Sequence, residues 1–250
     1  MDVNPLILTA NPFFEAYIQS DLLGKLIFLS LYALSICSWI VLLHKLWMTY
    51  RAKQSAARFY EAFLLQKNNP LNLECDHLNK KQGFNPFVDI YKVLKKQALD
   101  VMAKNRHFQT GGASNGNPSG ATLSLSDIDY LASHLSTQVS SQVKNLDKNL
   151  YILSTTVSLA PFLGLLGTVW GILTTFSEMQ SQTVGSTHDM VLGGLSLALA
   201  TTVLGLLDAI PALVGYNYLK NSIRDFSIEM EGFANEILAN VELQYRKVDA

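Results

Sequence analysis

The stretch that decides the fold is Ser158-Leu-Ala-Pro-Phe-Leu-Gly-Leu-Leu-Gly-Thr-Val-Trp-Gly-Ile172. It lies inside a longer run, Asn149 to Ser177, that contains no Asp, Glu, Lys, Arg or His. A helix of about 20 apolar residues crosses the hydrocarbon core of a bilayer. This run therefore predicts a membrane-spanning helix with residues to spare.

Small side chains recur along this predicted helix at steps of three and four, which places them on one side of it. They are Gly164, Gly167, Thr168, Gly171 and Thr175. Small residues let helix backbones approach closely in lipid, so this side predicts packing against another helix. Pro161 removes one helical hydrogen bond, a loss that membrane helices tolerate where neighbouring groups satisfy the freed carbonyl.

Two more charge-poor runs occur, Leu26 to Leu43 and Met190 to Leu219, the latter interrupted only by Asp208. Only 16% of the 250 residues are charged, and the mean hydropathy is +0.18. The predicted fold class is an all-α polytopic membrane protein. Its three transmembrane helices are expected at residues 25–44, 149–177 and 190–219.

The cations lie on one side of the predicted spans. Of the 19 Lys and Arg, only Lys25 lies outside residues 45–148 and 220–250, which the positive-inside rule assigns to the cytoplasm. Residues 1–24 and 178–189 contain no cation and are expected on the outer side. The N-terminus is thus predicted outside and the C-terminus inside. A cleaved signal peptide is not expected, because no basic segment precedes the first apolar run.

Outside the spans the sequence predicts further helices and one loop. Residues 1–24 contain an amphipathic piece suited to the membrane surface. The first helix is expected to continue from Arg51 to about Gln66. Asn85-Pro86 predicts a helix start with Asn as cap and Pro at the first position. Residues 108–125 are rich in Gly, Ser and Asn and predict a mobile loop.

The second span is predicted to begin well before the membrane. Ser126 with Asp129 resembles a capping box. Apolar residues then follow at steps of three and four up to Leu153, so one unbroken helix is expected from Asp127 to Phe176, about 75 Å long. The third span is expected to continue past Leu219 in the same way. The predicted architecture is therefore two long helices that extend into a cytoplasmic helical bundle.

The third run repeats the stripe of small and polar residues. Its members are Gly194, Ala198, Thr201, Gly205, Asp208, Ala212 and Gly215. Asp208 is the only ionisable residue within the second and third predicted spans, and such a residue is by default a functional hypothesis. Pro211 frees the carbonyl of Leu207, which a polar group can contact. The alternative for Asp208 is a structural role, hydrogen-bonded to a neighbouring subunit or directed toward the cytoplasm.

Two segments carry a resemblance to a known family. Ala160-Pro-Phe-Leu-Gly-Leu-Leu-Gly-Thr-Val-Trp-Gly-Ile172 and Gly194-Leu-Ser-Leu-Ala-Leu-Ala-Thr-Thr-Val-Leu-Gly-Leu206, with Ala209-Ile-Pro-Ala212, resemble the signature segments of the ExbB/TolQ proton-channel family, which is related more distantly to MotA. The resemblance implies a subunit of the bacterial inner membrane that forms a homo-oligomeric ring, a pentamer in the family. It implies an ExbD/TolR-like single-span partner, a TonB/TolA-like energy transducer, and proton-motive force driving work on periplasmic or outer-membrane partners.

The family's polar positions are carried over residue by residue. Thr168 and Thr202 match the two motif threonines that face the channel in the family. Leu197 stands where members usually have a glutamate facing the pore, which is a departure from the pattern. Asp208 lies three helical turns from Leu197 on the same face, with Thr201 also on that face, so it is a candidate replacement for the missing acid. The expected pore-lining set is Thr168, Thr201, Thr202 and Asp208.

Other function classes fit the sequence less well. A ring-forming structural homologue without proton conduction remains open because of Leu197. A small-solute transporter normally has inverted repeats and more than three spans. No catalytic or nucleotide-binding constellation indicates an enzyme, and no cofactor or nucleic-acid partner is expected. Cys75-Asp76-His77 is interpreted as a polar loop, because a closed metal site needs about four ligands.

Overall fold

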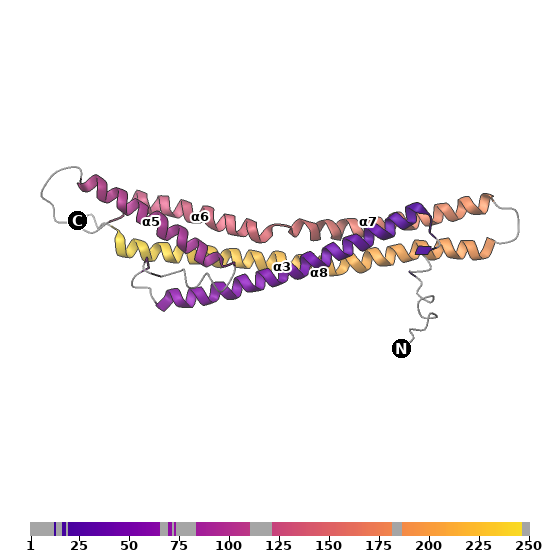
Figure 1. The fold of residues 1–250 in the computed structure, drawn as a ribbon, viewed down its shortest axis with the longest axis horizontal. Coiled ribbons are helices and arrows are strands. Elements are labelled where there is room, and N and C mark those ends of the chain that lie inside the picture. The colour runs from indigo at the N-terminus through magenta and orange to yellow at the C-terminus, as the bar shows by residue number, and fades with distance from the viewer. Residues whose placement is uncertain are drawn as a thin grey trace. The chain divides into compact units, whose positions relative to one another are not determined.

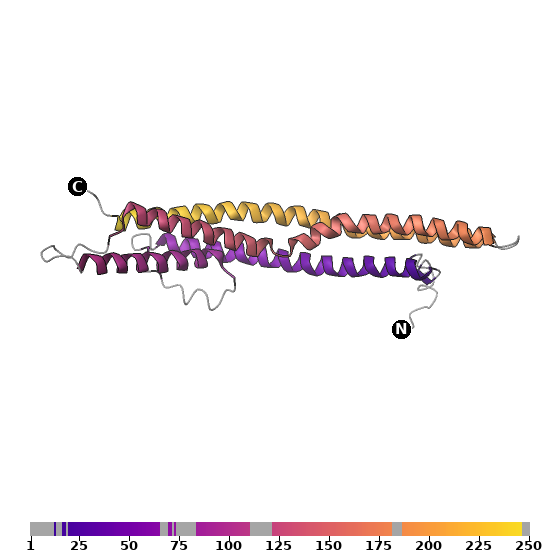
Figure 2. The same ribbon diagram turned by 90° about the horizontal axis from the view of Figure 1, so that it is seen from above.

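The computed structural model describes residues 20–65, 84–110, 122–181 and 187–246, together with Phe13, Tyr17, Ile18, Pro70, Leu71 and Leu73. The predicted amphipathic segment, Cys75-Asp76-His77 and most of the Gly/Ser loop fall largely or wholly outside these residues. Five long helices occur in the described part of the chain (Figures 1 and 2). They are α3 (Leu22–Leu65), α5 (Pro86–Thr110), α6 (Leu125–Asp147), α7 (Leu150–Ser181) and α8 (Thr187–Tyr245).

Three of these helices are long and apolar enough to cross a membrane. The candidate spans lie in Leu22–Leu65, Leu150–Ser177 and Gly194–Tyr245, with mean hydropathies of 2.4, 1.7 and 2.0 over their most apolar windows. This confirms the predicted fold class. The predicted continuations are also confirmed: α3 runs unbroken to Leu65, and α8 continues through the third span to Tyr245.

The unbroken helix expected from Asp127 to Phe176 is wrong. The chain forms two helices, α6 and α7, separated at Lys148 and Asn149. Asn149 has φ 68°, in the left-handed region, where a helix of L-residues cannot continue. Asn is among the few non-glycine residues that adopt this conformation readily. The apolar residues keep their spacing of three and four across the break, so the sequence pattern did not reveal where α6 ends.

The chain divides into two compact units. Unit 1 comprises residues 1–45 and 149–218, and unit 2 comprises residues 46–148 and 219–250. In unit 1, the first part of α3 packs with α7 and α8 around a small cluster of buried side chains, Ile27, Leu31, Ala160 and Ala209.

The outer surface of unit 1 is apolar while polar side chains are buried inside it. Phe162, Leu207 and Val214 are 67%, 67% and 65% exposed, whereas Thr156 and Thr201 are 0% and 1% exposed. In water this distribution would be costly, because apolar surface is stabilised by removal from water. It suits a unit surrounded by lipid or by other membrane helices.

Unit 2 has an aromatic core where α3, α5 and α8 meet. The ring of Phe87 stacks on Phe233 at 4.3 Å between centroids, and Phe59 and Phe63 meet Phe233 edge-on. Helix α5 begins as predicted, because the Asn85 carboxamide oxygen accepts hydrogen bonds from the backbone N–H groups of Phe87 and Val88 at 3.2 and 3.4 Å. Helix α6 adds the buried residues Ile128, Leu131, Leu135, Val139 and Leu146.

The capping box predicted at Ser126 and Asp129 lies two residues earlier. Ser124 is the N-cap of α6, its hydroxyl accepting a hydrogen bond from the Asp127 N–H at 3.2 Å. The Asp127 carboxylate in turn accepts from the Ser124 N–H at 2.9 Å and from the Asn105 amide of α5 at 2.8 Å. The contact with Asn105 favours Asp127 over Asp129 as the acidic member of the box.

Candidate functional site

The candidate site in unit 1 is the contact between α7 and α8, which carries both motif segments. Glycines lie where the two backbones come closest. A Cβ added at Gly205 would lie 2.5 Å from the carbonyl oxygen of Ala160, and one at Gly171 would lie 3.1 Å from both the Ala198 Cβ and the Gly194 carbonyl oxygen. Ordinary Cβ contacts are longer than this, so the helices can approach closely only because these side chains are absent.

Two more glycines make room for threonine side chains rather than for backbone. A Cβ at Gly167 would collide with the side chain of Thr201, and a Cβ at Gly194 would collide with that of Thr175. The small-residue stripes on the two helices therefore meet each other within one chain. The sequence indicated that these residues lie in a helix contact but did not identify the contacting helix.

Prolines lie inside both helices next to this contact. Pro161 follows Ala160, whose carbonyl Gly205 approaches, and Pro211 lies three residues after Asp208. Each lacks the N–H that would bond the carbonyl four residues earlier. The hydrogen bond that Pro161 cannot donate is missing from α7 directly beside Ala160, which is 0% exposed and closely packed.

The threonines differ in what they contact. The Thr202 hydroxyl donates to the carbonyl oxygen of Gly164 at 3.1 Å, and the Thr201 hydroxyl reaches the same oxygen at 3.4 Å and that of Ala198 at 2.8 Å. The Thr168 hydroxyl instead donates within its own helix, to Leu165 at 2.7 Å, and its side chain is half-buried. Thr201 thus lies within the helix contact, while Thr168 lies at its edge.

Asp208 is a buried carboxylate in an apolar unit. Its side chain is 6% exposed, and neither carboxylate oxygen has a hydrogen-bond partner among the described residues. Ser35 of α3 is near enough to interact with it. A buried carboxylate without a bonding partner is costly in a membrane, so its presence requires an explanation other than packing. Leu197 lies on α8, but its side chain is outside the described part of the structure.

Sequence reasoning missed a polar contact of the motif tryptophan. The Trp170 indole N–H donates to the Asp21 carboxylate at 2.8 Å. The other oxygen of Asp21 accepts from the Gly24 N–H at 2.8 Å, so Asp21 also caps the start of α3. An Asp directly before an apolar run was a visible capping signal, but its contact with Trp170 depends on residues 149 positions apart.

Metal ligation finds no support in the described ranges. Within them, no group of three or more His, Cys, Asp or Glu is arranged to hold a metal ion. The polar groups at the α7 and α8 contact are threonine hydroxyls and backbone carbonyls, and the Asp208 carboxylate lies on α8 near Ser35 of α3. Such groups can form hydrogen bonds with water and exchange protons, and they define a polar site within helices that are otherwise apolar.

Comparison with known proteins identifies the family of this chain. A model of the MotA/TolQ/ExbB proton channel family matches residues 105–232, which include both motif segments. The chain therefore belongs to the MotA/TolQ/ExbB proton channel family, and the family predicted from the sequence is confirmed.

Individual relatives extend the similarity over most of the chain. "Biopolymer transport protein ExbB" of Aquifex aeolicus is 41% identical over 99 residues, 40% of this chain and 66% of that protein. "Biopolymer transport protein ExbB" of Xanthomonas campestris pv. campestris (strain B100) is 28% identical over 211 residues, 84% of this chain and 78% of that protein. "Tol-Pal system protein TolQ" of Haemophilus influenzae is 26% identical over 220 residues, 88% of each chain. The relatives thus include proteins named for two different systems.

Proposed function

We propose that this protein is the channel-forming subunit of a proton-driven motor in the bacterial inner membrane. Identical copies form a ring, a pentamer by analogy with the family, around the transmembrane helix or helices of a smaller ExbD/TolR-like protein. Proton flow through this assembly drives work on periplasmic or outer-membrane partners through a TonB/TolA-like energy transducer. Membership of the proton channel family and the relatives named ExbB and TolQ support the proposal.

The observation that carries the proposal is Asp208. A carboxylate that is 6% exposed and lacks a hydrogen-bond partner within the described residues is expected to serve a function in a membrane protein. Its position on α8, in the helix that also bears Thr202, supports a polar path along this helix. We assign Thr168, Thr202 and Asp208 to that path. Thr201, which is 1% exposed, contributes its hydroxyl to the wall formed with Gly164.

The apolar exterior of unit 1 supports the ring. The described part of one chain has three candidate spans, and their exposed side chains include Phe162 and Leu207 at 67% each. Three helices cannot enclose a polar lumen alone, whereas several copies can arrange polar groups inward and apolar groups toward lipid. The proposed orientation has the N-terminus in the periplasm and unit 2 in the cytoplasm, because the Lys and Arg residues are concentrated at 45–148 and 220–250.

A second candidate is a ring-forming homologue that no longer conducts protons. Leu197 favours it, because the family's usual acidic side chain is missing at that position. Solute transport is a weaker candidate, since transporters usually have inverted repeats and more spans than the three candidates found in the described residues. The two leading candidates share the ring and differ only in proton flux.

Two measurements on the full-length protein test the proposal. Native mass spectrometry of the chain in mild detergents and in nanodiscs should give a homo-oligomer, and a monomer in all of them would contradict the ring. The complex with the single-span protein that copurifies with the tagged chain is then reconstituted in liposomes that contain a pH-sensitive dye. Proton uptake driven by a membrane potential supports the channel, whereas an intact ring without uptake supports the non-conducting homologue.

A further inference from the structure

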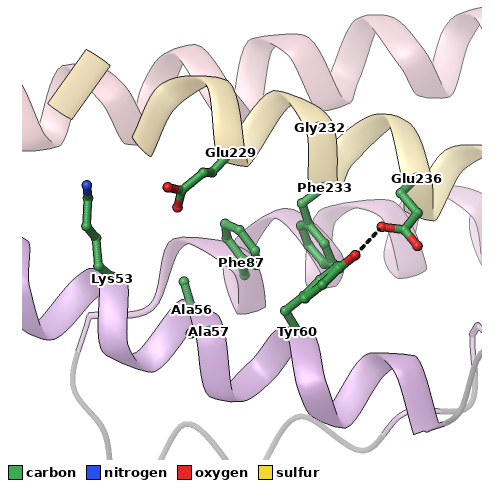
Figure 3. Close-up of a pocket in the computed structure, with 9 residues that line it drawn as sticks. All are labelled: Lys53, Ala56, Ala57, Tyr60, Phe87, Glu229, Gly232, Phe233 and Glu236. Atoms are coloured by element: carbon green, nitrogen blue, oxygen red, sulfur yellow. Dashed lines mark hydrogen bonds between the residues drawn. The ribbon is translucent and has the colours of Figure 1, made fainter. Parts of the chain in front are cut away.

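A cavity of about 500 Å³ lies within unit 2, between α3, α5 and α8 (Figure 3). Its walls combine aromatic side chains with a few charged ones. The residues that decide its chemistry are Lys53 and Tyr60 on α3, Phe87 on α5, and Glu229, Phe233 and Glu236 on α8. A cavity of this size with an apolar lining and few polar groups is typical of small-ligand sites.

The floor of the cavity is aromatic and firmly packed. Phe87 and Phe233 are stacked at 4.3 Å with an interplanar angle of 5°, and Phe226 stacks on the other side of Phe87 at 6.0 Å. Phe87 and Phe233 are 6% and 3% exposed. Because these rings are held on several sides, the small part of each that reaches the cavity is a preformed contact for an apolar body.

Two carboxylates of α8 border this floor. Glu229 and Glu236 are seven residues apart, about 10 Å along the helix, so a single small cation can contact only one of them. Glu236 accepts a hydrogen bond from the Tyr60 hydroxyl at 2.9 Å (Figure 3). That hydrogen bond, with burial, raises the pKa of Tyr60, so Tyr60 remains a neutral donor and Glu236 an acceptor. Glu229 forms no hydrogen bond or ion pair with any residue that the structure describes.

Lys53 does not neutralise Glu229 by direct contact. Its ammonium lies 5.9 Å from the centre of the Phe226 ring, and no ion pair links it to Glu229 in the described part of the chain. The cavity therefore has two carboxylates and one ammonium group, with Glu229 as the carboxylate left to meet a ligand.

Gly232 is an unusual wall residue. It lies inside α8, where glycine destabilises a helix relative to alanine, and a Cβ added there would meet no atom within 4 Å. Among the residues that the structure describes, no contact requires a glycine here, in contrast to Gly205, which lies close to the Ala160 carbonyl oxygen. A glycine on the wall of a cavity permits close approach of another molecule to the helix backbone.

We propose that this cavity binds an amphipathic cation, with an ammonium or guanidinium group at Glu229 and an apolar or aromatic body lying along Gly232 on the rings of Phe87 and Phe233. Charge-assisted hydrogen bonds to a carboxylate and contact with aromatic rings both favour such a ligand. The same chemistry is provided by a free aromatic amine or by a basic side chain on a peptide, and the test separates these sources.

The test uses cysteine protection in the full-length protein in nanodiscs. Ala57→Cys on α3, in a background with Cys37→Ser and Cys75→Ser, places a thiol on the cavity wall and leaves Gly232 unchanged. Leu65→Cys on the same helix, at a position that is 88% exposed and does not line the cavity, is the matched control. Phenethylamine or the peptide acetyl-Ala-Arg-Phe-Ala-amide should slow maleimide labelling at position 57 in a saturable way and leave position 65 unchanged.

Neutral and anionic probes decide whether the charge matters. If 2-phenylethanol protects as well as phenethylamine, the cavity selects apolar shape alone. If 3-phenylpropanoate protects better than phenethylamine, Lys53 determines the selectivity. Either result overturns the proposal, and so does a lack of protection by both cations. Protection by phenethylamine points to a free amine as the ligand, and protection by the peptide alone points to a segment of a protein.

Charge variants test the role of Glu229. Glu229→Gln should weaken phenethylamine or peptide binding about tenfold, because a hydrogen bond to a charged group is lost. Glu231→Gln is the matched control, since Glu231 lines a separate cavity between α6 and α8 and should leave binding unchanged. Lys53→Met should tighten binding by removing a like charge. Equal affinity in the Glu229→Gln and Glu231→Gln proteins would overturn the proposal.

Discussion

The hydroxyl of Thr202 on α8 donates a hydrogen bond across 3.1 Å to the carbonyl oxygen of Gly164 on α7. The same glycine provides the room for this contact, because a Cβ at position 164 would lie 3.0 Å from the Cα of Thr202. The position of the motif threonine and the spacing of the two helices are therefore coupled. A change that separates α7 from α8 is expected to displace Thr202 as well.

Two glycines of α8 predict stability effects of opposite sign. Gly205→Ala should destabilise the protein by about 1–3 kcal/mol, because the added methyl group would lie 2.5 Å from the carbonyl oxygen of Ala160 and forces a backbone shift. Gly232→Ala should instead stabilise it by about 0.5–1 kcal/mol, since its methyl group meets open space and alanine favours the helix. Unfolding of both variants in mixed detergent and SDS measures the difference. Equal effects at the two positions would contradict the close contact at Gly205.

The left-handed backbone at the break between α6 and α7 limits which residues are tolerated at position 149. Because Asn149 has φ 68°, Asn149→Gly should be tolerated, whereas Asn149→Val should cost about 1–2 kcal/mol. Thermal unfolding followed by circular dichroism measures both variants. If the valine variant unfolds at the wild-type temperature with higher helix content, the break is not required and α6 and α7 can form one helix.

The fold was predictable to the extent that it depends on runs of apolar residues. The absence of charge between Asn149 and Ser177 was sufficient to predict a span, and periodic apolar residues predicted that α8 continues to Tyr245. The break at Asn149 was not predictable in this way, because it depends on the backbone conformation of one residue while the apolar period continues on both sides.

The candidate site was predictable along single helices and not between them. Steps of three and four identified the glycine faces, since that spacing is intrinsic to a helix. Asp208 lies near Ser35 of α3, and Trp170 bonds to Asp21, the residue that caps α3. No local pattern relates residues so distant in sequence, so these contacts could be recognised only in three dimensions.

Asp127 predicts a loss of stability at low pH. Burial alone would raise its pKa, but hydrogen bonds from Ser124 and Asn105 outweigh this and lower the pKa of Asp127 below its usual value. The stabilisation is therefore present above the usual carboxyl pKa and is lost as the pH falls through the lowered value. Ser124→Ala, which removes the N-cap, should cost about 1 kcal/mol at pH 7. The Asp127→Asn protein should lack this acid-dependent loss in unfolding measured between pH 3 and 7; an unchanged pH profile would exclude Asp127 as its source.

Asp89 predicts the opposite pH dependence. Burial raises its pKa above the usual value, opposed by Lys92 and by the hydrogen bond from the Gln142 amide at 3.3 Å. The protonated carboxyl is thus favoured by folding, and stability decreases as the pH rises from the usual carboxyl pKa through the raised value. Asp89→Asn should stabilise unit 2 at pH 7 and remove this decrease. The exposed Asp129 provides the control substitution, Asp129→Asn, for which no such change is expected. A less stable Asp89→Asn protein at pH 7 would show that the ionised form is favoured instead.

Measuring both protein stability and proton uptake for Asp208→Asn distinguishes a proton-relay role of Asp208 from a structural role. If Asp208 carries protons, Asp208→Asn should keep the ring intact and reduce proton uptake to the level of protein-free liposomes. Its stability should be unchanged or higher, because the variant removes a buried carboxylate that has no hydrogen-bond partner in the described structure. If Asp208 is structural, the same variant should conduct normally or lose assembly. Asp225→Asn, on the exposed part of the same helix, is the matched control and should match wild type in both measurements. Full uptake by an intact Asp208→Asn ring would rule out the relay and leave Thr168 and Thr202 as the polar path.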